Sequence, residues 1–280
     1  MRSIQGVPLV NRNAKPPVSK PVVGIKRALL IGINYLEDER NRLSGCINDI
    51  LNIEKKLRIT HPECKEFRKL SDDQTDLAKK PTRTNILDGI QWLTNGLNAG
   101  ESVFFHYSGH GGLTIDTSGD ESSGYDSCIY PIRNGQIEMI LDDELRSLLV
   151  NTIPADCKCF AVLDCCHSGS VLDLRYMYNA PSYGTLTMRQ DDKYPKTKGS
   201  VILLSGCKDT QTSADTVNAN NVPSGALTNA LLTVWGKYGM EIKFKYLLWD
   251  IRKVLQSGGY NQIPQLSCSN NIQINDTFKL

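Results

Sequence analysis

The sequence predicts an α/β protein whose mostly parallel central β-sheet is flanked by α-helices on both faces. Short, continuous apolar runs recur along the chain, and stretches with helical spacing separate them. Such runs are typical of strands buried on both faces, and parallel strands need crossover helices between them. The 280 residues, 40% of them hydrophobic, are also enough to bury one extensive core.

The first expected strand is the apolar run RALLIGINY at 27–35. A helix over 48–57 follows, because its aliphatic residues recur on one side. A second helix is expected over 82–97, where Thr82 or Thr84 follows a proline and can serve as the N-cap. These three elements form the first strand–helix alternation of the chain.

Two further apolar runs, 101–112 and 157–166, are expected to be central strands, with a short helix over 142–150 between them. Residues 262–269 contain a proline, which removes a backbone donor, so we expect an edge strand there. The remaining elements are a strand over 200–207 and helices over 225–238 and 243–255.

We expect one domain over 24–280, preceded by a flexible arm over 1–23 that contains four prolines and no periodicity. Between 175 and 199 the pattern of apolar runs stops, and a long linker loop is expected. This loop, 175–199, divides the domain into a larger part, 24–174, and a smaller part, 200–280.

Charge and cysteine content narrow the class of protein. A net charge of +2 gives no reason to expect binding to nucleic acid or to an anionic membrane. No run approaches the ~18 apolar residues of a membrane span, and the N-terminus lacks a signal-peptide core. Nine cysteines, an odd number without framework spacing, indicate reduced thiols. We therefore expect a cytoplasmic protein.

Reactive side chains follow two of the expected strands. SVFFHYSGHGG places Ser108 and His110 among glycines, and CFAVLDCCHSG places Asp164, Cys165 and Cys166 before a histidine. In an open α/β sheet, sites form beyond the carboxyl ends of the strands. A cysteine nucleophile needs an imidazole within reach, and glycines let backbone N–H groups approach an oxyanion.

The cysteines allow two other interpretations, a zinc site and a pair of buried structural thiols. In an extended strand that rises ~3.3 Å per residue, Cys157 and Cys165 would be ~26 Å apart, so they cannot share a zinc ion. Adjacent buried thiols without chemistry would not explain why Asp, His, Ser and Gly occur at the same few positions. Nucleophilic catalysis is therefore the favoured hypothesis.

The motif HYSGHGG, followed about 50 residues later by DCCHSGS, resembles the catalytic pair of the metacaspases, which are caspase-like cysteine peptidases. The similarity continues through KRALLIGINY, LSGCINDI, PTRTNI, ILDDEL, LLSGCKDTQTSAD, GALTNAL and PQLS, and so covers nearly everything after residue 25. The short arm and the order of the two parts resemble the type I group. The resemblance implies a caspase-like fold and, generally, a monomer.

The resemblance assigns His110 as general base and acid and Cys166 as nucleophile. Cys165 remains a candidate for a minor or backup nucleophile. Backbone amides near Gly111 and Cys166 are expected to hold the oxyanion. No Asp or Asn side chain that would orient the histidine is evident, so the sequence predicts a dyad. His106 and His167 are expected to be structural.

Metacaspases cleave after Arg or Lys, and the resemblance places the acidic pocket of the family at Asp49 and Asp164. Ser108 lies beside these acids, and Cys46 maps near them. A guanidinium that enters a semi-buried pocket needs carboxylates to replace its lost hydration. A helix N-terminal charge is the alternative explanation for Asp49 alone.

The similarity to calcium-dependent type I metacaspases nominates Asp126, Asp142, Asp143 and Asp173 as Ca²⁺ ligands. Hard carboxylate oxygens suit calcium rather than zinc. Helix capping and solvation would explain Asp142 or Asp143 individually. No EF-hand loop fits the sequence: if Asp116 is counted as the first position, the twelfth is Ser127, where a bidentate Glu is required.

The sequence thus predicts a calcium-dependent cysteine endopeptidase that acts on proteins or peptides with Arg or Lys at the cleavage position. Such an enzyme could process itself at basic residues of the linker loop or the arm. Two alternatives stay open at this point. One is a non-proteolytic scaffold or proteostasis factor on the same fold, and the other is a related protease of the paracaspase or legumain type.

Overall fold

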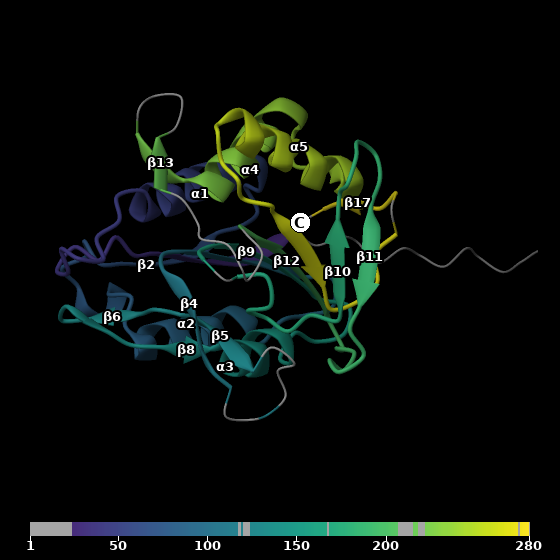
Figure 1. Ribbon diagram of the computed structural model, residues 1–280. Helices are drawn as coiled ribbons and strands as arrows, with labels where there is room; N and C mark the ends of the chain where they lie inside the picture. The colour runs from purple at the N-terminus through teal and green to yellow at the C-terminus, as the bar shows by residue number, and fades with distance from the viewer. Residues whose placement is uncertain are drawn as a thin grey trace, which may run out of the picture.

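A computed structural model describes residues 24–116, 119, 124–166, 168–206, 215–217, 222–273 and 275–279. An eight-stranded sheet runs through the centre of this part of the chain (Figure 1). The expected arm over 1–23 lies outside the described residues. No helix among the residues described is long and apolar enough to cross a membrane.

The central sheet has the strand order β11-β10-β16-β12-β9-β3-β1-β2. The five strands from β12 to β2 are mutually parallel, and β16, β10 and β11 add antiparallel pairs at the other edge. In chain order the strands are β1 (Ile25–Gly32), β2 (Glu66–Ser71), β3 (Ser102–Ser108), β9 (Lys158–Asp164), β10 (Tyr176–Asn179), β11 (Thr187–Gln190), β12 (Ser200–Ser205) and β16 (Gln265–Cys268). The expected mostly parallel α/β sheet is confirmed.

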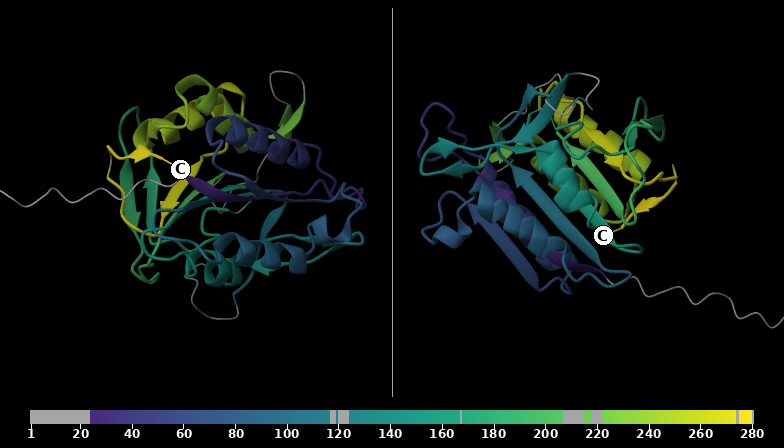
Figure 2. Two further views of the ribbon diagram at one scale, coloured as in Figure 1. Left: turned by 180° about the vertical axis from the view of Figure 1, so that it is seen from behind. Right: turned by 90° about the horizontal axis from the view of Figure 1, so that it is seen from below.

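Helices cover both faces of this sheet (Figures 1 and 2). On one face lie α1 (Cys46–Thr60), α4 (Ala226–Tyr238) and α5 (Phe244–Ser257), and on the other lie α2 (Arg83–Thr94) and α3 (Asp142–Leu145), which continues as a π-helical turn over Arg146–Val150. A one-turn 3₁₀ helix spans Leu77–Lys79. Thr82 caps α2, because its side chain accepts the Asn85 N–H at 3.2 Å. All five predicted helices are therefore present.

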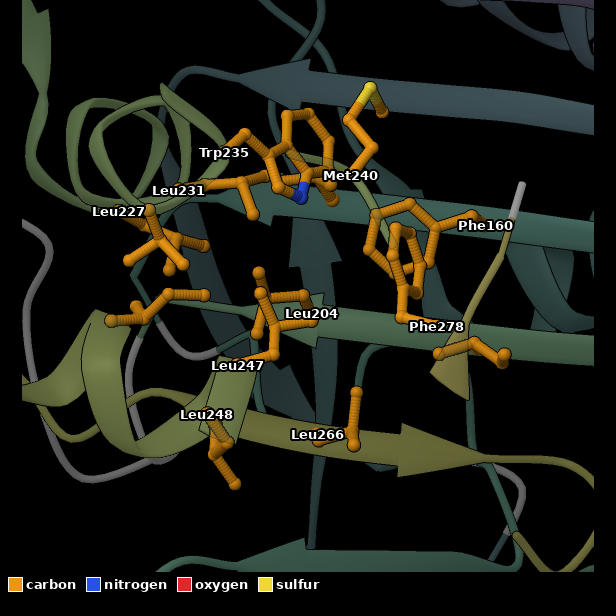
Figure 3. Close-up of a cluster of buried hydrophobic side chains, with 14 of the residues drawn as sticks. Phe160, Leu204, Leu227, Leu231, Trp235, Met240, Leu247, Leu248, Leu266 and Phe278 are labelled. Atoms are coloured by element: carbon orange, nitrogen blue, oxygen red, sulfur yellow. The ribbon is translucent and has the colours of Figure 1, made fainter. Parts of the chain in front are cut away.

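Alternating side chains of the strands build the two cores. Leu30 of β1 and Phe104 of β3 face α1 and α4, whereas Leu29 and Phe105 face α2. Figure 3 shows the first core, where Phe160 and Trp235 meet Phe278 from the C-terminal end of the chain. Burial on both faces explains why β1, β3 and β9 read as continuous apolar runs.

Two sequence expectations were wrong. Residues 175–199 do not form a plain loop: Tyr176 and Tyr178 are buried, and their segment β10 pairs with β11 as a hairpin on the sheet. β16 is not an edge strand but lies between β10 and β12. Its proline, Pro264, precedes the first strand residue, so the ladder loses no donor.

Several short strands were not expected from the sequence. β2 contains charged residues and no continuous apolar run, so the sequence did not predict it. Charged residues suit its position at the edge of the sheet. Beyond the carboxyl end of β3 a small antiparallel sheet has the order β4-β5-β8, with β4 (Gly111–Ile115), β5 (Tyr125–Ile129) and β8 (Ile140–Leu141). The other pairs are β6 (Ile132–Arg133) with β7 (Gln136–Ile137), β13 (Asp215–Val217) with β14 (Pro223–Gly225), and β15 (Ile242–Lys243) with β17 (Thr277–Phe278).

Candidate active site

The neighbouring strands β3 and β9 bring the two sequence motifs to one edge of the sheet. Ser108 at the end of β3 lies in register with Asp164 at the end of β9, and the chains continue to His110 and Cys166. A Cβ added to Gly111 would overlap the carbonyl oxygen of Cys166 and lie 3.0 Å from Cys165 Sγ. The two motifs are thus in direct contact, and only glycine fits between them.

The imidazole of His110 is oriented by the main chain. Its Nε2 lies 2.7 Å from the carbonyl oxygen of Asn41. A carbonyl oxygen can only accept, so Nε2 carries the hydrogen, and in the neutral ring Nδ1 is the basic nitrogen. The predicted dyad of His110 and Cys166 would therefore have a main-chain group that orients the imidazole, and sequence reasoning missed this group because a carbonyl has no sequence signature.

Two buried tyrosines fix the backbone of His110. Tyr35 Oη accepts the His110 N–H at 2.9 Å, and Tyr107 Oη donates to the His110 carbonyl at 2.7 Å. The rings of Tyr35 and His110 also pack with centroids 4.6 Å apart. Burial raises the pKa of both phenols above the ordinary range, so they remain neutral hydrogen-bonding groups.

The adjacent cysteines have different environments. Cys165 is fully buried in the core below the sheet edge, whereas Cys166 is half-buried. Ser168 Oγ donates to the carbonyl of Cys165 at 2.9 Å and so holds the turn that follows β9. Cys166 is therefore the more accessible of the two residues, and Cys165 could be reached only by displacing core side chains. All eight cysteines in the described ranges are free thiols.

The two other histidines in the described ranges, His61 and His106, have no contact with His110 or Cys166. His106 is fully buried, with Nε2 3.1 Å from Thr228 Oγ1, and burial lowers its pKa to about 3. It is therefore a neutral structural group, as expected. His61 follows α1 and pairs with Glu63, with 2.9 Å between Nδ1 and Oε1. His167 lies outside the described residues.

A pair of buried carboxylates lies beside the strand ends. Asp49 of α1 is fully buried, and Ser108 Oγ donates to its Oδ2 at 2.7 Å. Asp164 is also buried and accepts the Thr228 N–H at 2.8 Å. Cys46 lies one turn before Asp49 in the same helix and is buried as well. The structure thus brings the four predicted pocket residues to one place.

The Asp49 carboxyl group titrates abnormally. Burial and the neighbouring charge of Asp164 raise its pKa to about 8, although hydrogen bonds from Ser224, Ser108 and Gly225 oppose the rise. Two carboxylates in one dry site repel each other, so the pair favours a bound cation that replaces their lost hydration. This charge distribution suits the ammonium or guanidinium group of a basic side chain.

The four aspartates nominated for calcium lie near one another but do not converge. Asp126, Asp142 and Asp173 are buried, whereas Asp143 is exposed. Asp142 Oδ2 accepts the Ser127 N–H at 2.6 Å, and Ser127 Oγ lies 2.8 Å from Ser170 Oγ. Their donors are hard oxygens, which suit calcium. Within the described part of the chain, however, no three acidic, His or Cys side chains are close enough to hold a metal ion.

Comparisons with known proteins agree with this geometry. The family model described as "Metacaspase, peptidase C14 domain" matches residues 26–175. Metacaspase-1 of Candida albicans is 38% identical over 91% of this chain and 67% of its own length. Metacaspase-1 of Mycosarcoma maydis is 36% identical over 91% of this chain and 73% of its own length.

Solved structures also share the fold. A crystal structure of a Geobacter sulfurreducens protein superposes with a TM-score of 0.62 at 24% identity, and covers 89% of this chain and 95% of its own. The crystal structure of Caspase-1 from Spodoptera frugiperda superposes with a TM-score of 0.50 at 12% identity, over 92% and 93% of the two chains. At these identities the likeness concerns the fold, which is caspase-like.

Proposed function

The chain belongs to the metacaspase family of C14 cysteine peptidases, and from this premise we propose that it is a calcium-dependent endopeptidase that cleaves after Arg or Lys. The observation that supports the proposal is that three groups lie at or beside the ends of β3 and β9. These groups are the oriented His110, the accessible Cys166, and the buried Asp49–Asp164 pair.

In the proposed mechanism, His110 Nδ1 takes the proton of the Cys166 thiol and the thiolate attacks the scissile carbonyl carbon. The oxyanion is held by backbone N–H groups near Gly111 and Cys166. The tetrahedral intermediate collapses, the C–N bond breaks, and His110 returns the proton to the leaving amine. Water, with His110 as base, then hydrolyses the thioester and regenerates the thiol.

Burial favours Cys166 over Cys165 as the nucleophile. Cys165 Sγ lies in the core with Tyr35 and Tyr107, and a thiolate there would be poorly solvated. Cys166 is partly exposed, and its main chain lies immediately beside Gly111. A backup role for Cys165 would require the core to open.

Specificity for Arg or Lys is proposed to come from the acid pair. The side chain at the cleavage position would place its cation against Asp164 and Asp49, where two carboxylates replace the lost hydration. A substrate with Asp at the same position would add a third negative charge, so its binding should be strongly disfavoured.

Calcium dependence is proposed on the donor chemistry of Asp126, Asp142, Asp143 and Asp173. When bound, the ion would neutralise these carboxylates and draw their loops together. Asp173 follows Cys166 by seven residues, so such an ordering would reach the loop that carries the nucleophile. The described conformation does not gather three of these side chains, and the proposal therefore requires them to move on binding.

Self-processing and a monomeric state complete the proposal. Arg189 and Lys193 are exposed on and after β11, where another active site could reach them. Incubation of the wild type with calcium, followed by N-terminal sequencing of the fragments, tests the first point. Light scattering tests the second.

The deciding experiment compares fluorogenic peptides with Arg or Asp at the cleavage position, with millimolar calcium and with chelator. Wild type, Cys166→Ala and Cys165→Ala are assayed together. Calcium-dependent cleavage of the Arg peptide, lost only in Cys166→Ala, is expected. Loss only in Cys165→Ala would contradict the choice of nucleophile, and no cleavage by any form would favour a scaffold function.

A further inference from the structure

The short strand β14, from the smaller part of the domain, lies directly on the acid pair. Ser224 Oγ donates to Asp49 Oδ1 at 2.6 Å, across 175 residues of sequence. The Gly225 N–H donates to both carboxylate oxygens, at 3.0 Å to Oδ1 and 2.9 Å to Oδ2. Together with Ser108, these groups hold the Asp49 carboxylate in one orientation.

Neither Gly225 nor Gly45 has room for a side chain where β14 meets the acid pair. A Cβ added to Gly225 would overlap Asp164 Oδ2 and lie 2.7 Å from Asp49 Oδ2. On the other side, a Cβ added to Gly45 would lie 2.6 Å from the carbonyl carbon of Ser224. The segment is therefore fixed between the loop before α1 and the two carboxylates, and it covers one side of the acid pair.

The chemistry of these donors preserves negative charge. Two hydroxyl groups and one N–H bind Asp49, and each is neutral, so they stabilise the carboxylate without cancelling its charge. His106, the ionisable base behind the pocket, is held neutral by burial. An arginine or lysine of the protein in place of Ser224 would instead satisfy the acids internally.

We propose that Ser224 is a positioning residue for substrate specificity, which with the Gly225 N–H holds the Asp49 carboxyl group in the orientation in which the acid pair binds the cation of an Arg or Lys substrate. This inference rests on the proposed function and deepens it. It adds a segment from the smaller part of the domain to an acid pair whose members both come from the larger part.

The groups that face Asp49 determine its response to pH. Asp164 of β9 opposes its ionisation, whereas Ser108 of β3 and Ser224 and Gly225 of β14 favour it. Loss of the Ser224 hydroxyl should therefore raise the pKa of Asp49 further. At any pH below that value a smaller fraction of the pocket is charged, and cation binding weakens.

The test uses Ser224→Ala, with Ser224→Thr as the variant that restores a hydroxyl. Ser267→Ala is the matched control, because Ser267 is a buried serine whose hydroxyl has no partner among the described residues. For the Arg peptide we expect KM to rise about 10- to 100-fold in Ser224→Ala, with kcat within about twofold. Thr should restore most of the loss, and Ser267→Ala should match wild type.

Binding is measured separately from catalysis by calorimetry with agmatine, a guanidinium amine, in the Cys166→Ala background. Ser224→Ala should weaken agmatine binding by the same factor, and its binding should recover as the pH is raised. Unchanged KM and unchanged agmatine affinity in Ser224→Ala would overturn the inference. If Ser224→Ala fails to fold, Ser224→Cys replaces it, because a thiol is a weak donor of similar size. Agmatine affinity of Ser224→Cys should be lower than that of Ser224→Thr but still measurable. Equal agmatine affinity for wild type, Ser224→Thr and Ser224→Cys would also overturn the inference.

Failure of the proposed function gives a different result. Wild type would then neither cleave the Arg peptide nor bind agmatine, whereas failure of this inference alone leaves wild type active and the Ser224 variants indistinguishable from it.

Discussion

Two groups of aspartate residues in this molecule differ in how far their side chains are already held in place. Asp49 of α1 and Asp164 of β9 are held by neutral donors, and both carboxyl groups are buried side by side. The four aspartates proposed for calcium come from β5, α3 and the turn after β9, and no three of them converge. The first group is ready for a cation, whereas the second would be assembled by one.

The difference follows from where each carboxylate is attached. Asp164 ends β9 in register with Ser108 at the end of β3, and Ser108 donates to Asp49 of the long helix α1, so regular elements of the main fold set the positions of both acids. The calcium candidates lie on short strands and turns outside that ladder, and Asp173 has a left-handed φ of 49°. A site on regular elements of the central fold can be preorganised. A site on the surrounding loops can change conformation when its ligand binds, and so can regulate activity.

The largest expected effect separates the two groups by function. Asp164→Asn keeps the shape of the side chain and its acceptor for the Thr228 N–H but removes one charge of the pocket. We expect kcat/KM for the Arg peptide to fall about 100-fold or more. The calcium concentration for half-maximal activity should not change. Asp88→Asn, an exposed carboxylate on α2, is the control. A loss of calcium response in Asp164→Asn would contradict the separation.

The reverse experiment removes a charge from the second group. Asp126→Asn or Asp173→Asn should raise the calcium concentration for half-maximal activity about 10- to 100-fold, because each removes a charged oxygen ligand. At saturating calcium, KM for the Arg peptide should equal that of wild type. Asp142 is a poorer choice, because its carboxylate also accepts backbone N–H groups of Ser127 and Asp143. Unchanged calcium dependence in both variants would remove these residues as ligands.

Hydrogen exchange should show the same contrast directly. Calcium should slow amide exchange about tenfold in β5 and in residues 168–174, because the ion would order segments that are loosely held without it. Exchange in α1, which carries Asp49, should not change. Mass spectrometry of peptide fragments with and without calcium provides the measurement. Equal protection of both regions would mean that calcium acts on the whole domain.

The strands that lead to His110 and Cys166 could be predicted because burial on both faces leaves continuous apolar runs. The hairpin β10–β11 could not, because β11 is fully exposed and β10 buries only alternate residues. The positions of His110 and Cys166 at one sheet edge followed from the same runs, with the family resemblance to assign their roles.

Two parts of the site had no signal in the sequence. The carbonyl of Asn41 and the N–H of Gly225 act through the main chain, which every residue possesses. Ser224 is a common polar residue far along the chain from Asp49, and only the folded structure shows their contact. Sequence patterns reveal rare side chains at strand ends, but not the neutral groups that orient them.

The smallest expected effect concerns pH and refines the picture of the preorganised pair. Because the pKa of Asp49 is raised to about 8, its carboxyl is largely protonated below that pH and ionised above it. Agmatine affinity of the Cys166→Ala protein should therefore rise with pH and level off above this value. The rise should be about fivefold, because Asp164 still supplies a charge when Asp49 is neutral.

The variant Asp164→Asn sharpens this last prediction. The substitution removes the charge that opposes ionisation of Asp49, so the pKa of Asp49 should fall. The rise of agmatine affinity with pH should therefore move to lower pH. Calorimetric titrations of agmatine at several pH values, for both proteins, give the two curves. Use of the Cys166→Ala background excludes titration of the nucleophile as a cause. A rise at the same pH in both proteins would mean that another group sets it, and the two acids would then act independently rather than as a coupled pair.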